Sequence, residues 1–464
     1  MANEAKIGED DGMATPRQEN AIPNKTLDDF LKIDKEAFPS RANTVTGDEN
    51  YTSLPENSFQ SWATLVGVWL IQFCGFGYAS AFGVYEDFYV TDYLTNYGTS
   101  VISWIGSTQL FILLSIGVIS GRLFDKGHFY SVMIFGSVLY VFSLFMLSLC
   151  KPQHYYQIFL SQAIGAGIGA GVCFIPSLAI LAQHFRKPYE RAIVMTIAVS
   201  GSSVGGAIHP IMLNKLFNSS VGFANGIRAS AGLIAFLSFV ALLLMRKNKN
   251  YEKEEKYETV PFWSAIRSFM RDPPYVLMIS ALILSAQGAF FPTYYLQLDS
   301  TKHGVNSSLT FYSLTILNGT ATIGRVVPGF LSRQIGLMNS TILTLTLCGI
   351  VIIGMFGISG PEGIISVAVV YGIVQGAYLA LIAPMLTLLA DHPSEIGERL
   401  GFGFIFQGLG GLIGPPITGA LLTSSYIWWR PILYSVCLIG CGVVLLIASR
   451  FLLKRKRDIK GCIL

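Results

Sequence analysis

Charged side chains are scarce in this sequence. Only 13% of its 464 residues are Asp, Glu, Lys or Arg and 52% are hydrophobic, whereas about 25% of a soluble globular protein is charged. The charges gather in residues 1–59, 246–272 and 450–464, so the long stretches between them suit lipid. This argues against an ordinary soluble enzyme. The basic end of the chain, which contributes to the net charge of +4, suits anionic lipid headgroups and gives no reason to invoke nucleic acid.

Other signatures are also missing. Six of the seven cysteines lie within or at the ends of apolar runs, which excludes a disulfide framework. Residues 1–59 show no signal-peptide pattern, so we expect a disordered cytosolic tail. The glycine-rich run 165–171 lacks the Lys-Ser/Thr of a phosphate-binding loop. No apolar segment carries a paired acid, a histidine cluster or an activated nucleophile, and we therefore expect neither an enzyme nor a bound metal or cofactor.

What the sequence does contain is a series of long apolar segments. Each is long enough to cross about 30 Å of hydrocarbon at about 1.5 Å per residue. We count twelve, which predict an all-α membrane protein with spans at 61–84, 101–121, 129–149, 156–183, 191–213, 226–245, 274–297, 307–331, 338–358, 363–389, 399–422 and 431–452. No acidic residue lies inside any of these predicted spans.

An even number of crossings places both termini on one side of the membrane. Loops on that side carry twenty Lys and Arg residues and the opposite loops carry five, so the positive-inside rule puts both termini in the cytosol. We expect the plasma membrane, with an organelle membrane as the alternative. The predicted organisation is a disordered tail (1–59), a first half of six helices (60–245), a cytosolic connector (246–273), a second half of six helices (274–452) and a basic tail (453–464).

The two predicted halves repeat at an offset of 208 residues. This register aligns Gly121 with Gly329, Pro176 with Pro384, Glu190-Arg191 with Glu398-Arg399, and Ala81-Phe82 with Ala289-Phe290. Two parallel halves related by an axis along the membrane normal are typical of transporters that hold their substrate near the midplane, between the halves.

A short loop follows the second span, with the sequence Gly121-Arg122-Leu123-Phe124-Asp125-Lys126-Gly127. It resembles the loop signature of the major facilitator superfamily. Asp125 can accept hydrogen bonds from a helix N-terminus or an arginine, and this latch must break when the inner gate opens; the alternative is a solvated turn. In the second half Arg333 replaces the acid, which puts a latch there in doubt. The residues to which we assign gating are Asp125, Arg122, Lys126, Glu190, Arg191, Glu398 and Arg399.

Further stretches carry a closer resemblance. They are His184 to Lys187, Ser200 to Gly206, Phe82 to Tyr85, Ile102 to Ser107, Arg271 to Tyr275 and Gly324 to Gly329. Together they resemble the monocarboxylate transporter family, particularly its fungal branch, over roughly residues 60 to 450. Animal members of that family use a first-helix lysine and an eighth-helix aspartate beside an arginine for proton-coupled carboxylate transport. Here those places hold Val84 and Ala321, and only the arginine, Arg325, remains.

Arg325 is the only charge well inside a predicted span, where an arginine costs about 2.5–3.5 kcal/mol. We interpret it as a bidentate donor for a substrate carboxylate or another anion; the alternatives are snorkelling to the cytosolic face or pairing within the fold. Uncharged side chains can also orient a solute or simply join helices, and the candidates are Asn318, Gln287, Tyr294, Tyr295, Gln375, Gln109 and Gln407. The two tyrosines rank highest because Pro292 should distort the seventh span.

His209 is the only histidine deep inside a predicted span. A neutral imidazole titrates near physiological pH, which makes His209 a candidate for proton coupling. The alternative role is a hydrogen bond to a neighbouring helix.

Together these observations predict a secondary active or facilitative transporter with the major facilitator fold, working by alternating access. We expect it to carry a small organic solute, a monocarboxylate or related organic anion, with protons as the candidate coupling ion. One alternative is an exporter or facilitator of another metabolite, such as a vitamin or secondary product. The other is a non-transporting membrane sensor with the same fold.

Overall fold

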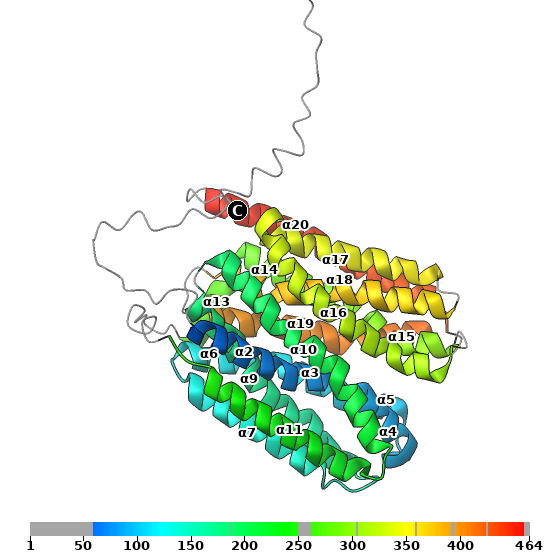
Figure 1. Cartoon of the computed structure of the whole chain (residues 1–464). Helices are drawn as coiled ribbons and strands as arrows, with labels where there is room; N and C mark the ends of the chain where they lie inside the picture. Colours follow the sequence, from blue (N-terminus) through cyan, green and yellow to red (C-terminus); the bar gives the residue numbers. More distant parts are fainter. Residues whose placement is uncertain are drawn as a thin grey trace, which may run out of the picture.

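The computed structural model describes residues 59–185, 187–248, 261–302, 305–357, 360–390, 395–423 and 426–458. Every regular element in these ranges is a helix, and most of the long helices run alongside one another in Figure 1. The predicted N-terminal tail, part of the connector and residues 459–464 lie outside the described residues.

The first group of helices comes from residues 59–244. Its first helix is interrupted twice and ends in a π-helical turn. The elements are α2 (Phe59–Cys74), α3 (Phe76–Ala79), α4 (Phe82–Phe88), the π-helical turn Tyr89–Tyr93, α5 (Thr99–Ser115), α6 (Gly117–Asp125), α7 (Phe129–Leu147), α8 (Tyr155–Ile158), the π-helical segment Phe159–Ala166, α9 (Gly167–His184), α10 (Pro188–Phe217) and α11 (Gly222–Leu244).

The second group follows the connector. It begins with a short helix and a helix that is interrupted once. The elements are α13 (Phe262–Phe269), α14 (Pro273–Ala289), α15 (Phe291–Lys302), α16 (Ser307–Ile335), α17 (Leu337–Gly354), α18 (Pro361–Leu388), α19 (Ile396–Leu422) and α20 (Trp429–Asp458).

Eleven helices within the described ranges are long and apolar enough to cross a membrane, and each corresponds to a predicted span. The remaining predicted span, 307–331, is α16, which has 29 residues. Its hydroxyl, amide and arginine side chains make α16 less apolar than the other spans. It nevertheless packs closely between α10 and α18, so it belongs to the same bundle.

The first span is longer than the sequence predicted. It runs from Phe59 to Tyr93, whereas the prediction ended at Val84 because the charged residues Glu86 and Asp87 follow. Glu86 is half-buried and accepts a hydrogen bond from the Ser103 hydroxyl of α5. The expectation that no acid lies within a span was therefore wrong.

The groups are joined mainly by α10 with α16 and by α6 with α19, and α5 with α19 and α10 with α18 also contact each other. Figure 1 shows the blue-to-green helices of the first group below the yellow-to-red helices of the second, with α10 and α16 where they meet. A Cβ atom at Gly121 would collide with the backbone of Gly397, and one at Gly329 would collide with Ile193 and Thr196 of α10. Gly121 and Gly329 match at the 208-residue offset, so equivalent glycines lie at equivalent crossings.

Equivalent helices also break at matching places. The chain leaves the helix between α3 and α4 at Ser80 and Ala81, and between α14 and α15 at Phe290; Ala81 and Ala289 match at the same offset. Pro292 lies in the first turn of α15, where its missing N–H removes no helical hydrogen bond. The predicted distortion of the seventh span is confirmed.

Candidate functional site

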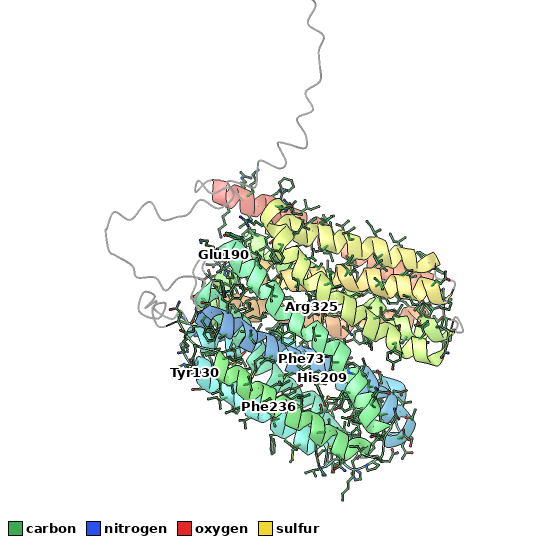
Figure 2. All side chains as sticks on the ribbon, viewed as in Figure 1. Phe73, Tyr130, Glu190, His209, Phe236 and Arg325 are labelled. Atoms are coloured by element: carbon green, nitrogen blue, oxygen red, sulfur yellow. The ribbon has the colours of Figure 1, made fainter. Side chains whose placement is uncertain are left out.

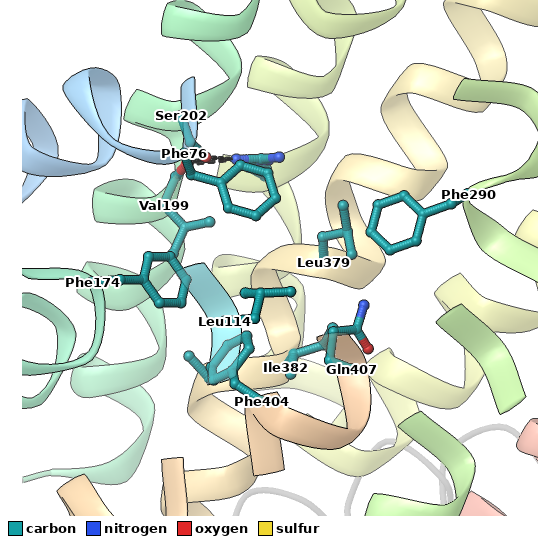
Figure 3. A pocket seen from close by; sticks show the side chains of 12 residues that line it. Phe76, Leu114, Phe174, Val199, Ser202, Phe290, Leu379, Ile382, Phe404 and Gln407 are labelled. Atoms are coloured by element: carbon teal, nitrogen blue, oxygen red, sulfur yellow. Dashed lines mark hydrogen bonds between the residues drawn. The ribbon is translucent and has the colours of Figure 1, made fainter. Parts of the chain in front are cut away.

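A cavity lies where the two groups of helices meet. Its volume is about 30 Å³ in this conformation, so it is smaller than a small-molecule site and would have to widen to hold a solute. Nine of the lining side chains are apolar and three are polar. From the first group they are Phe76, Leu114, Phe174, Val199 and Ser202, and from the second Phe290, Arg325, Leu379, Ile382, Ala383, Phe404 and Gln407 (Figure 3).

Arg325 reaches the cavity from α16 and is 5% exposed. Its Nη1 donates hydrogen bonds to the backbone carbonyl of Val199, at 2.8 Å, and to the Ser202 hydroxyl, both on α10. Its Nε has no hydrogen-bonding partner among the residues that the structure describes. The guanidinium is thus held across the interface by one nitrogen, and Nε still has a proton to donate.

These contacts bear on the alternatives for Arg325. A buried guanidinium in the cavity wall does not snorkel to the end of the bundle. The bonds to α10 are a pairing within the fold, but they use only Nη1. A buried donor without an acceptor costs about 1–3 kcal/mol, so the unpaired Nε favours a role in ligand binding.

Gln407 enters the cavity from α19 and is 2% exposed. Neither its amide oxygen nor its amide nitrogen has a hydrogen-bonding partner in the described part of the chain. Figure 3 shows its amide directed toward the space between Leu379 and Phe290. The cavity therefore contains two buried polar side chains with unused hydrogen-bonding capacity.

The other amide and phenol candidates do not line this cavity. Most of their side chains form hydrogen bonds within the helix bundle instead. Gln375 donates to Ala289 O at 2.7 Å and pairs with Thr293, and Gln287 accepts from Tyr434 at 2.7 Å. Tyr295 donates to Pro415 O at 2.8 Å, and Asn318 donates to Leu314 O at 3.1 Å. Gln109 is buried and Tyr294 is 40% exposed. The structure thus brings Arg325 and Gln407 to one cavity and places the remaining candidates elsewhere.

His209 lies on α10 and is fully buried. Its Nε2 is 3.3 Å from the carbonyl oxygen of Phe73, and its ring packs on the rings of Phe73 and Tyr78. Figure 2 shows His209 beside Phe73, away from Arg325. The Tyr78 hydroxyl bonds to that of Tyr85. His209 therefore does not line the cavity; it contacts the first helix just before the helix breaks.

Asp125 closes one end of the interface, the end at which α11 finishes and α14 begins, here termed the connector end. Its carboxylate accepts hydrogen bonds from the backbone N–H groups of Gly397, at 3.2 Å, and Glu398, at 2.9 Å. Both groups belong to the first turn of α19, where the helix dipole favours an anion. Arg122 forms an ion pair with Glu398 at 3.6 Å. These contacts join the two groups of helices as a latch would.

The sequence comparison agrees with this architecture. The model of the family described as "Major Facilitator Superfamily" matches residues 64–393. The chain belongs to the major facilitator superfamily. It is a multi-pass membrane protein of transporter type.

Curated relatives of this superfamily member are fungal. The aspyridones efflux protein apdF of Emericella nidulans is 33% identical over 398 residues, 86% of this chain and 79% of the relative. The agnestins efflux protein AgnL12 of Paecilomyces divaricatus is 31% identical over 437 residues, 94% of this chain and 96% of the relative. The names refer to efflux of those compounds and not to monocarboxylates.

Solved structures with the same fold include a bacterial homologue of the iron transporter ferroportin in its outward-facing state. It aligns with a TM-score of 0.64 and 14% sequence identity, covering 84% of this chain and 99% of that one. The predicted fold, a helical bundle of the major facilitator type, is confirmed.

The remaining gating candidates of this superfamily member make other contacts. Arg399 donates to Glu395 at 3.0 Å and to Asp272 at 3.2 Å, and it lies over the rings of Phe269 and Tyr275, all in the second group. Glu190 accepts hydrogen bonds from Lys187 and Tyr189, its neighbours at the start of α10. Lys126 acts electrostatically on Glu398, and Arg191 lies in the first turns of α10.

The equivalent of the Asp125 latch in the second half is a different contact. Arg333, which occupies the matching place, lies over the ring of Tyr189 at 5.4 Å from the ring centroid. A cation above an aromatic ring is attracted less strongly than a carboxylate that accepts two N–H groups. A cation–aromatic contact between α16 and α10 therefore takes the place that Asp125 has between α6 and α19.

Sequence reasoning did not assign the apolar walls or Ser202 to the site. The four phenylalanines come from α3, α9, the α14–α15 break and α19, and nothing in a hydrophobic run distinguishes a cavity-lining Phe from a lipid-facing one. Ser202 lies in the stretch that resembles the monocarboxylate transporters, and that signal pointed to it without giving it a role.

Proposed function

We propose that this chain exports an amphipathic organic acid by alternating access. The observation that supports the proposal is the composition of the cavity, in which nine apolar side chains, four of them Phe, surround a buried arginine and a buried glutamine. An aromatic or branched aliphatic body would cover these walls, at about 25 cal/mol per Å² of apolar surface buried. A solute as small as lactate would leave most of them uncovered.

The acidic group is proposed from Arg325. A carboxylate can accept two N–H groups from one edge of a guanidinium, and Nε is available on the edge that α10 does not use. The carboxylate is the one feature of the substrate that we retain from the resemblance to monocarboxylate transporters. Val84 and Ala321 stand where animal members have their proton-coupling lysine and aspartate, so we do not extend the proton-linked mechanism of those members to this chain.

The direction and the membrane are proposed from relatives and charge. Two curated relatives are named efflux proteins, and the excess of basic residues at the connector end favours a cytosolic placement of that end and of both termini. We propose that residues 60–245 and 274–452 move as two halves in the plasma membrane. The Asp125 latch would then be broken whenever the cavity opens to the cytosol.

A panel of solutes tests the proposal. Purified protein in vesicles should take up labelled naphthoate by counterflow, an exchange assay that needs no known driving ion, with a lower KM than labelled lactate. Naphthamide, which has the same aromatic body without the carboxylate, serves as the matched control and should be a poor substrate. A preference for lactate, or equal transport of naphthoate and naphthamide, would contradict an amphipathic acid.

His209 is the residue we propose for proton coupling. It contacts Phe73, one residue before α2 ends, and Phe76 of the cavity follows the break, so its protonation would act on the cavity through the broken helix. We expect His209→Gln, which keeps an N–H group for Phe73, to remove the pH dependence of counterflow. Unchanged pH dependence would exclude His209 and direct attention to Glu86, a half-buried acid on the same broken helix.

A further inference from the structure

Gln407 is buried without satisfying its own amide. Both amide atoms lack a partner within the described ranges, although a buried polar group normally has one. Gln375, on the preceding helix α18, offers a contrast, because its equally buried amide forms hydrogen bonds with Ala289 and Thr293. The bundle can therefore satisfy a buried glutamine, and at Gln407 it does not.

The orphaned amide faces the cavity and not the packed core. Gln407 lines the cavity together with Phe404, its neighbour on α19, and Leu379 of α18. Because both amide atoms are unpaired, this holds whichever way round the amide is placed. A solute that reaches Gln407 covers an amide that has no partner within the described part of the chain. It loses affinity unless it supplies both a donor and an acceptor.

The shape of a primary amide limits which groups can do this. Its oxygen and one N–H lie on the same edge, so the complement is an N–H and a C=O that also share an edge. An open-chain secondary amide is trans and directs these two groups to opposite sides. A lactam is held cis by its ring and presents both groups together.

We infer that Gln407 is a second recognition site in the cavity and that it binds the lactam edge of the transported molecule. The inference rests on the proposed function and makes the substrate class narrower. The acid lies at Arg325, the lactam at Gln407 and the apolar body against the phenylalanines. Arg325 supplies only donors, so it cannot replace Gln407 in binding a lactam N–H.

The test uses carbostyril carboxylate, a fluorescent aromatic lactam whose carboxylate lies across the ring from the lactam nitrogen, and its N-methyl analogue. Methylation removes the N–H and leaves the acid and most of the body unchanged. Counterflow by the wild-type protein should show a KM at least about 10-fold lower for the N–H compound, as expected when a buried acceptor is left unpaired.

Gln407→Met keeps the size of the side chain and removes its polar atoms. We expect this variant to transport both compounds with similar KM. Leu379→Met introduces methionine at an apolar position of the cavity. This variant should keep the preference for the N–H compound. Loss of the preference in both variants would show a general loosening of the cavity and would overturn the assignment to Gln407.

The outcomes separate this inference from the proposed function. Equal KM values for the two compounds in the wild type overturn the lactam site, while sensitivity of both to Arg325→Lys leaves the proposed function standing. If neither compound shows saturable transport while naphthoate does, only the lactam site is overturned; if naphthoate is not transported either, the proposed function is overturned with it.

Discussion

Replacing Arg325 by Lys should reduce transport of an organic acid about 10- to 100-fold, measured as kcat/KM in counterflow. Lysine keeps the charge but has no planar fork, so it cannot hold two acceptors on α10 and still present a second edge to a carboxylate. Hydrogen bonds to charged groups contribute about 1.5–3 kcal/mol, which corresponds to a factor of about 10 to 100.

Arg430→Lys provides the matched control. Arg430 is exposed and lies over the ring of Trp429 at the start of α20, away from the cavity, so this variant should transport as the wild type does. The N–H groups of Arg325 also anchor α10, and a melting curve should show that the Arg325 variant is folded. A folded Arg325→Lys protein with wild-type kcat/KM would remove Arg325 from the site.

Replacing Gly121 by Ala should block the closure of the connector end. The new methyl group would collide with the backbone of Gly397, which cannot move aside as a flexible side chain would. Overpacking of this kind costs about 1–3 kcal/mol, and here the cost falls on the state in which α6 and α19 are in contact. We expect at least about a fivefold loss of transport and a lower melting temperature.

Gly319→Ala is the comparison for this experiment. Gly319 lies on α16, is exposed, and has open space where its Cβ would be placed. Alanine favours a helix over glycine by about 1 kcal/mol, so this variant should melt at the same or a higher temperature and keep its transport. If both variants respond alike, the α6–α19 crossing has no special role in closure.

The sequence predicted the helices well because burial in lipid requires long apolar runs. It predicted the pairing of Gly121 with Gly329 because duplication preserves the residues at equivalent crossings. It missed the true end of the first span, since Glu86 looks like a boundary until Ser103, from the next helix, is seen to bond to it. Hydropathy alone cannot recognise such a partner.

The cavity was harder to predict than the fold. Tyr295 and Gln407 are equally plausible in sequence, yet Tyr295 bonds to the carbonyl of Pro415, 120 residues away, and Gln407 bonds to nothing in the described chain. Contacts between helices that are distant in sequence decide whether a polar side chain forms a hydrogen bond within the bundle or remains available to a ligand. Arg325 was predictable because placing a charged side chain inside a membrane span costs free energy, so such a residue indicates a functional role.

Flux across a membrane tests the central claim most directly. Purified protein in vesicles, preloaded with carbostyril carboxylate, should exchange it with external compound in a saturable manner, whereas empty vesicles should not. The Arg325→Lys protein should exchange it about 10- to 100-fold less efficiently. Saturable binding of the same compound without exchange would contradict a transporter and would identify the chain as a membrane sensor that has kept the transporter fold.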